Sequence, residues 1–158
     1  MATFAIESNG RIEKTAIYFN GEQLGGLKEL LLNLNEDGTF DTVIQYTGTN
    51  DKLYIKNIFQ DTLENIKVVQ PSFTEEEAKT LTQLVVESDG DINNTDLLMN
   101  GETLSGVVNI FVHIKSNKMK ESGLKSIFGK SDESFNADFK SEITYRNEDG
   151  SLDTERIF

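Results

Sequence analysis

Residues 7–15, ESNGRIEKT, are repeated eighty positions later at residues 87–95 as ESDGDINNT, and residues 20–26, NGEQLGG, are repeated at residues 100–106 as NGETLSG. Aligning residues 3–35 with residues 83–115 needs no gap and gives ten identities, against about two expected by chance at average composition. About half of the mismatches exchange one apolar residue for another. Because self-similarity at a fixed spacing is typical of a repeated structural unit, the sequence predicts an internal duplication.

A second and thinner alignment continues the repeat at a different spacing. Residues 40–59 align with residues 139–158, ninety-nine positions later, and Tyr46 then matches Tyr145. The change of spacing requires an insert of nineteen residues in the second copy, at about residues 117–135. We therefore predict one compact domain over residues 1–158, which consists of repeat 1 at 3–59, a joint at 60–82 and repeat 2 at 83–158.

The two copies together settle the structure of a segment that one copy leaves ambiguous. Residues 28–34, KELLLNL, have the composition of a helix, but residues 108–114, VNIFVHI, alternate in polarity and include the β-branched residues of a strand. Because two copies of one unit share a structure, we predict a strand in both. The Asn-Gly pairs that open the repeated NGE motif are typical of tight hairpin turns. Each unit is then a five-stranded meander, with strands in the first copy at 3–8, 12–19, 23–35, 39–47 and 52–59, and the joint adds a strand at 66–69.

The predicted fold class is mainly β. A single antiparallel meander has one apolar face and two open edges, so it is unstable alone. We expect the apolar faces of the two copies to close on each other as a pseudo-twofold β-sandwich or flattened barrel of about ten strands. Short helices are expected at about 74–81, after a capping signal, and at about 123–129. The alternative is two separate small β domains side by side.

The composition excludes several kinds of protein and site. The chain has no cysteine and one histidine, so it has no disulfide, no thiolate nucleophile and no zinc cluster. Its net charge of −12 repels phosphate groups, and we therefore expect no direct nucleic-acid binding. Residues 1–10 lack the basic and apolar regions of a signal peptide, and no apolar run is long enough to cross a membrane. We predict a cytoplasmic location and no membrane contact.

No group of residues has the pattern of a catalytic site. The strongest metal candidate is residues 89–96, DGDINNTD, which resembles the second half of a calcium loop, but Val85 stands where the first ligand belongs. The equivalent residues 9–16 keep the glycine and lose the ligands, so a β-turn explains the glycine. His113 is conceivable as a general base, yet its counterpart is Asn33, which favours a residue on a polar strand face. We predict no enzyme activity, no cofactor and no metal.

The insert is the main candidate for a binding segment. It is present in one copy only, and residues 115–130 hold five lysines against one acidic residue. The apolar residues within 124–128 are spaced for one face of a short amphipathic helix. A basic and partly apolar segment added to a duplicated body is a natural place for a contact. The residues predicted to bind are Lys118, Lys120, Leu124, Lys125, Ile127, Phe128 and Lys130. The alternative is a solvated loop with Phe128 against the sheet.

The sequence also resembles small β-sheet proteins that are encoded by phages and prophages. The resemblance rests on the order N-G-E-x-L-x-G, an alternating strand, Asp-Gly and a further strand at residues 20–46, and it recurs more weakly at residues 100–145. It implies no catalytic residues.

Three functional hypotheses follow. The first is a non-enzymatic protein that acts through protein–protein contacts, with a protein partner or with copies of itself joined through strand edges. The second is a binder of a small molecule or peptide, with its site between the repeats or under the insert at 117–135. The third is an acidic decoy, related to phage proteins, that occupies a nucleic-acid-binding protein.

Overall fold

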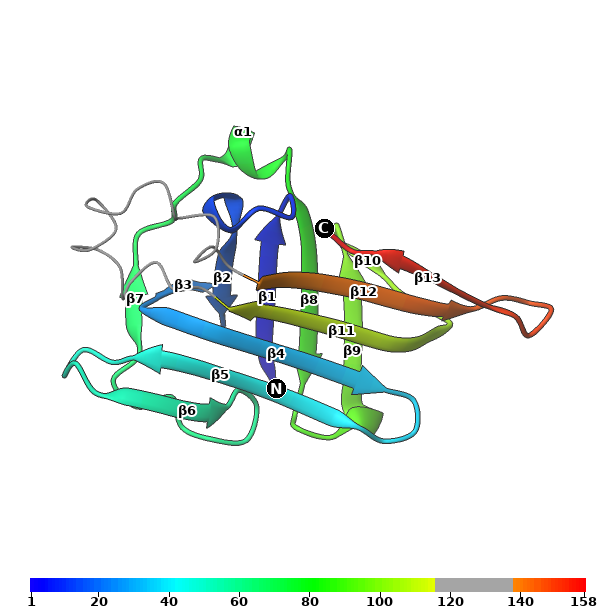
Figure 1. Cartoon of the computed structure of the whole chain (residues 1–158), viewed down its shortest axis with the longest axis horizontal. Helices are drawn as coiled ribbons and strands as arrows, with labels where there is room; N and C mark the ends of the chain where they lie inside the picture. The colour runs from blue at the N-terminus through cyan, green and yellow to red at the C-terminus, as the bar shows by residue number, and fades with distance from the viewer. Residues whose placement is uncertain (116–137) are drawn as a thin grey trace.

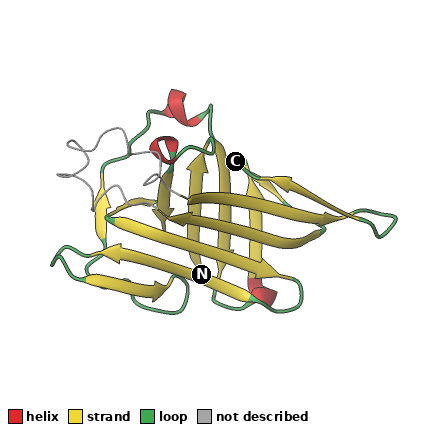
Figure 2. Cartoon of the chain, viewed as in Figure 1, coloured by secondary structure: helices red, strands yellow, loops and turns green. Residues whose placement is uncertain are grey.

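Two antiparallel β-sheets pack face to face in the computed structural model, which describes residues 1–115 and 138–158 (Figure 1). The strands of one sheet run steeply across those of the other, and helices are few and short (Figure 2). The predicted mainly β sandwich is therefore confirmed. The helix expected at 123–129 lies outside the described residues.

The seven-stranded sheet has the order β10–β9–β8–β1–β2–β3–β7, and the six-stranded sheet has the order β13–β12–β11–β4–β5–β6. The strands of the seven-stranded sheet are β1 (Ala2–Ser8), β2 (Ala16–Phe19), β3 (Glu22–Gly25), β7 (Lys67–Val69), β8 (Thr82–Ser88), β9 (Thr95–Met99) and β10 (Glu102–Thr103). Those of the six-stranded sheet are β4 (Leu27–Asn35), β5 (Phe40–Thr47), β6 (Leu53–Asn57), β11 (Val107–Lys115), β12 (Asp138–Arg146) and β13 (Leu152–Arg156).

Each half of the chain contributes three strands to each sheet, whereas the sequence predicted one sheet per copy. The expected strand at 23–35 is interrupted at Gly26, whose φ of 74° lies in the left-handed region. β3 ends before this residue, and β4 begins after it in the other sheet. A β-carbon at Gly26 would lie 2.6 Å from the carbonyl oxygen of Thr47, so this corner requires glycine. Gly106, with a φ of 72°, makes the same corner between β10 and β11.

The two halves meet at the centre of both sheets. β1 pairs with β8 so that Ala5 faces Val85, and β4 pairs with β11 so that Leu32 faces Val112. In each pair a residue faces its counterpart eighty positions later, as a twofold axis through both pairs requires. Bulges occur at matching places near the starts of β4 and β11. The common origin of the halves stays a prediction from the sequence.

One hydrophobic core lies between the sheets and draws on both halves. Along β4 and β11 the buried side chains alternate with half-buried ones, as expected for strands that are covered on one face. The prediction that residues 28–34 form a strand is therefore confirmed, and burial in the sheet overrides their helical composition. A core shared by both halves does not fit the alternative of two separate β domains. The inward residues of these strands are Leu30, Leu32, Leu34, Ile110, Val112 and Ile114.

The first part of the predicted strand at 12–19 is a turn. Ile12–Lys14 form a short 3₁₀ turn, and β2 begins after it. The hydroxyl of Thr15 donates a hydrogen bond to the carbonyl of Arg11 at 2.6 Å and lies 2.7 Å from the hydroxyl of Ser8. These side-chain bonds offer the backbone an alternative to the strand ladder. The same turn and bonds occur eighty residues later, before β9.

The helix predicted at 74–81 is shorter in the structure, where α1 comprises Glu75–Ala78. Its start was correctly indicated by the capping signal, because the Thr74 hydroxyl accepts a bond from the Glu77 N–H and the Glu77 carboxylate accepts one from the Thr74 N–H. The helix lies beside the outer face of the seven-stranded sheet, where a hollow of about 420 Å³ separates it from β1 and β8.

Candidate binding surfaces

The joint between the halves covers one end of the sandwich in the first half. β7 pairs with β3, so that Gln23 faces Val69 and Gly25 faces Lys67. The side chain of Gln23 is buried, and it donates a bond to the hydroxyl of Ser72 and accepts one from the Ser72 N–H, both at 2.8 Å. The edge of β3 is therefore closed by backbone pairing and by a side-chain clamp.

The chain before β7 covers the end of the core beside β5. Tyr46 is fully buried, its ring stacks on Tyr54 with centroids 5.3 Å apart, and its hydroxyl donates to the carbonyl of Glu64 at 2.7 Å. Leu63 and Ile66 pack against the core from the same segment. The joint thus provides an edge strand, two apolar side chains and a backbone acceptor.

Among the described residues, no strand covers the equivalent end of the second half. β10 occupies the place of β3, but it is the outermost strand of its sheet, and within residues 1–115 and 138–158 no strand pairs with its outer edge. Thr103 and Ser105 are exposed, and Leu104 and Tyr145 are half-buried, whereas their first-half counterparts Gln23, Leu24 and Tyr46 are buried. The described residues give the Tyr145 hydroxyl no hydrogen-bond partner.

The backbone of β10 is oriented to accept a further strand. The Leu104 N–H donates to the Leu97 carbonyl of β9 at 2.8 Å. Because backbone groups of successive residues in an antiparallel strand point to opposite sides, the N–H and C=O groups of Thr103 and Ser105 point away from β9. An edge with unpaired backbone groups is a template for pairing with another chain.

The second half is also the more acidic one. Residues 83–115 and 138–158 hold eleven acidic residues against four Lys or Arg. One of these cations, Arg146, is engaged by Glu36 through two hydrogen bonds of 2.7 and 2.8 Å. Burial and the neighbouring Glu155 raise the pKa of Tyr145 above its ordinary value, so its phenol stays neutral. These residues of the second half therefore carry a net negative charge.

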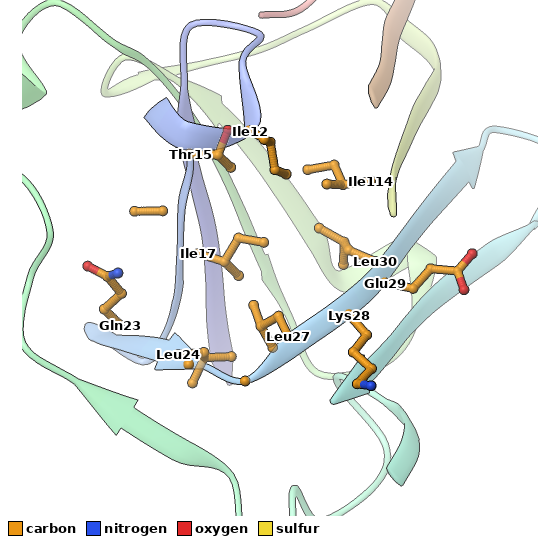
Figure 3. A pocket seen from close by; sticks show the side chains of 13 residues that line it. Ile12, Thr15, Ile17, Gln23, Leu24, Leu27, Lys28, Glu29, Leu30 and Ile114 are labelled. Carbon is orange, nitrogen blue, oxygen red and sulfur yellow. The ribbon is translucent and has the colours of Figure 1, made fainter. Parts of the chain in front are cut away.

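An apolar pocket of about 220 Å³ opens at the other side of the sandwich, between β2, β3 and β4 (Figure 3). The Lys28 and Glu29 side chains point away from the apolar ones in Figure 3, and Ile114 approaches from β11. Thr15 and Gln23 add polar atoms, but both are engaged in the hydrogen bonds described above. The pocket suits a small apolar group. Its apolar lining is Ile12, Ile17, Leu24, Leu27, Leu30 and Ile114.

The outer face of the six-stranded sheet carries the single histidine. His113 Nε2 lies 2.7 Å from the Glu29 carboxylate, and the Lys140 ammonium lies over the Phe111 ring at 5.6 Å. His113 thus lies on the outer face of its strand, opposite to the aliphatic row, as its counterpart Asn33 indicated, and it shares this face with Phe111. Further along this face, Leu53 and Ile55 of β6 are exposed at 55% and 67%.

The calcium-like residues serve as turn formers. Asp89 accepts bonds from the Asp91 N–H and the Asn94 side chain, and Asp91 accepts one from the Asn93 N–H at the start of the second 3₁₀ turn. Within the described part of the chain no three His, Asp or Glu side chains converge as a metal site would require. None of its helices combines the length and the apolar character needed to cross a bilayer.

The predicted binding residues of the insert, Lys118 to Lys130, lie outside the described residues. Sequence reasoning placed a strand at residues 66–69 in the joint, where the structure has β7, but it did not assign that strand to the edge of β3 and so missed the different edge at β10. A signal was present in the sequence. The joint follows repeat 1, and Gln23 and Gly25, which contact it, are replaced in repeat 2 by Thr103 and Ser105.

The chain matches no known protein family, no curated protein and no solved structure. The resemblance to phage-encoded β-sheet proteins therefore stays a prediction.

Proposed function

We propose that this protein is a non-enzymatic binding protein that acts through protein–protein contacts, and that its contact surface is the open end of the second half. One observation carries the proposal. Positions that are buried in the first half, Gln23 at 8% and Leu24 at 5% exposure, correspond to the exposed Thr103 and the half-buried Leu104 in the second half. Among residues 1–115 and 138–158 the joint covers one of the two equivalent ends, and the other has backbone groups without a strand partner and half-buried apolar side chains, which favour contact with another chain.

A matched pair of charge reversals tests the proposal. Glu102 and Glu22 are equivalent and both are exposed, so Glu102→Arg and Glu22→Arg make the same change at the open and the covered end. Proteins captured by the wild-type chain are identified and their affinities measured with each variant. We expect Glu102→Arg to weaken capture at least several-fold and Glu22→Arg to leave it unchanged. Equal capture by both variants contradicts the proposal.

Self-association through strand edges is one form of this function. Size-exclusion chromatography with light scattering distinguishes it, because a monomer of 17.7 kDa at high concentration leaves only contacts with a different protein. A dimer that is lost in Glu102→Arg and kept in Glu22→Arg places the self-contact at β10.

A second candidate function is the binding of a small molecule or peptide, and the apolar pocket of about 220 Å³ favours it. Thermal-shift screening with apolar compounds tests it, with and without residues 117–135. Stabilisation that survives the deletion excludes the insert as the ligand site. Stabilisation that disappears assigns it to the insert.

The acidic composition, with a net charge of −12, leaves the decoy as a third candidate. It predicts a nucleic-acid-binding partner whose capture weakens steeply as salt is raised. Capture that is insensitive to salt counts against it.

A further inference from the structure

We infer that the open edge of β10 binds an extended segment of another polypeptide as an added antiparallel strand, and that the segment needs a small residue where β7 has Val69. This inference rests on the proposed function and specifies the mode of contact. The molecule contains its own template, because β7 adds to β3 in this way at the equivalent edge. Addition of a strand to an exposed sheet edge is a recurring mode of peptide recognition.

The backbone of β10 matches that of β3 at the edge where β7 pairs. Gln23 and Gly25 lie opposite Val69 and Lys67, with Leu24 opposite Val68 between them. In β10 and the two residues after it, the outward-facing residues are Thr103 and Ser105, the counterparts of Gln23 and Gly25. A partner strand can therefore place its hydrogen bonds as β7 does.

Apolar side chains beside β10 offer further contacts for a partner. In the first half Leu63 and Ile66 pack against the core, and Tyr46 donates to a backbone carbonyl of the covering segment. In the second half Tyr145 and Leu104 are half-buried at this place. A partner segment can cover Tyr145 and Leu104 if it has two apolar residues three positions apart and the added strand follows directly after them.

Because Ser105 stands where the first half has Gly25, the partner strand must differ from β7 in the side chain that lies next to this position. A β-carbon at Gly25 would lie 2.6 Å from Cγ1 of Val69, but 3.8 Å from its Cβ and 3.6 Å from Cβ of Lys67. A strand with valine at that position therefore clashes with the side chain of Ser105, whereas alanine removes the clashing carbon. The second half selects against a copy of the joint of its own chain and for a segment with a small residue.

Peptide probes with the sequence of residues 60–70, QDTLENIKVVQ, test the inference. One peptide keeps the valine and the other carries Val69→Ala, and each is titrated to millimolar concentration into the isotope-labelled protein and followed by NMR. We expect saturable shifts at the amides of Thr103 and Ser105, and binding of the alanine peptide at least several-fold tighter than that of the valine peptide. Ser105→Gly should remove this difference.

Backbone pairing is tested separately on the peptide. N-methylation at residue 69 blocks an N–H that faces the acceptor edge, whereas N-methylation at residue 68 modifies one that faces away. We expect loss of binding with the first and little change with the second. On the protein side, Thr103→Pro removes an outward N–H at an edge that tolerates proline, and it should weaken peptide binding. Thr154→Pro in β13 makes the same change at an edge of the other sheet, and it should leave peptide binding unchanged.

Two results overturn the inference. The first is the absence of shifts at β10 with the alanine peptide at millimolar concentration, and the second is binding that is equally weakened by methylation at residues 68 and 69. If Glu102→Arg still abolishes capture of protein partners in that case, the open end binds proteins by another mode and the proposed function stands. If the peptides behave as expected but Glu102→Arg leaves capture unchanged, strand addition stands and the proposed function fails.

Discussion

The two halves of this protein share a backbone arrangement and differ in what covers it. The Thr15 and Thr95 turns, the Asn-Gly hairpins and the glycine corners are the same in both. At one edge, however, the first half has β7 and the clamp between Gln23 and Ser72, and the second half has the outward-facing backbone of β10. The difference shows that the joint does more than connect the halves, because it pairs with the edge of β3 and makes β7 the outermost strand of that sheet in its place.

The comparison predicts unequal costs for the same truncation at equivalent tyrosines. Tyr46 is fully buried and Tyr145 is half-buried, so Tyr46→Ala should destabilise by about 3–5 kcal/mol, as for other large aromatic truncations. Tyr145→Ala should cost roughly half of this or less. Denaturant unfolding of both variants measures the difference. Equal costs would mean that the second half is closed as tightly as the first.

A smaller effect is expected at the edges of β3 and β10. Gln23→Ala removes two hydrogen bonds made by a buried amide, which should cost about 1–3 kcal/mol. Thr103→Ala changes an exposed side chain, and its effect should stay within about 0.5 kcal/mol. Urea midpoints compared at equal m-values provide the measurement, and a Thr103→Ala cost as large as that of Gln23→Ala would contradict the open edge.

The smallest effect concerns the ion pair between the halves. Arg146 holds the pKa of Glu36 below its ordinary value through their two hydrogen bonds, and the counterpart of Arg146 is Thr47, so this link exists on one side only. A lowered carboxyl pKa adds stability at neutral pH that is lost as the pH falls through the folded-state pKa. Glu36→Gln should lower the stability slightly at pH 7, with no difference from wild type at a pH below that pKa.

Salt provides the control for this prediction. Both side chains are close to half-exposed, so high salt should screen the pair and shrink the difference between Glu36→Gln and wild type. A difference that persists unchanged at acidic pH and in high salt would assign the effect of the substitution to packing.

The sequence was sufficient for the features that repeat. Asn20-Gly21 and Asn100-Gly101 predicted hairpins, and the asparagines adopt the positive φ that such turns need, 50° and 52°. The alternation in residues 108–114 correctly predicted the strand state of residues 28–34. These signals are local, and each appears twice.

The exchange of strands between sheets could not be read in the same way. Gly26 lies within residues 23–35, which the sequence predicts as one strand, and its corner depends on the close approach of Thr47 from another part of the chain. The 3₁₀ turn at Ile12–Lys14 depends likewise on the Ser8 and Thr15 hydroxyls meeting across a bend. Whether the edge of β10 is open depends on which strands pair with it. Strand partners that are distant in the sequence leave no periodic pattern from which the pairing could be predicted.

Native-state amide hydrogen exchange of the free monomer tests the central claim most directly. The amides of Gln23 and Gly25 on β3 face β7, whereas those of Thr103 on β10 and of Ser105 just after it face no strand among the described residues. We predict strong protection at Gln23 and Gly25, and exchange at Thr103 and Ser105 close to the rate of an unstructured peptide. Equal protection at the four amides would contradict the account, because it would show that the second edge is already paired.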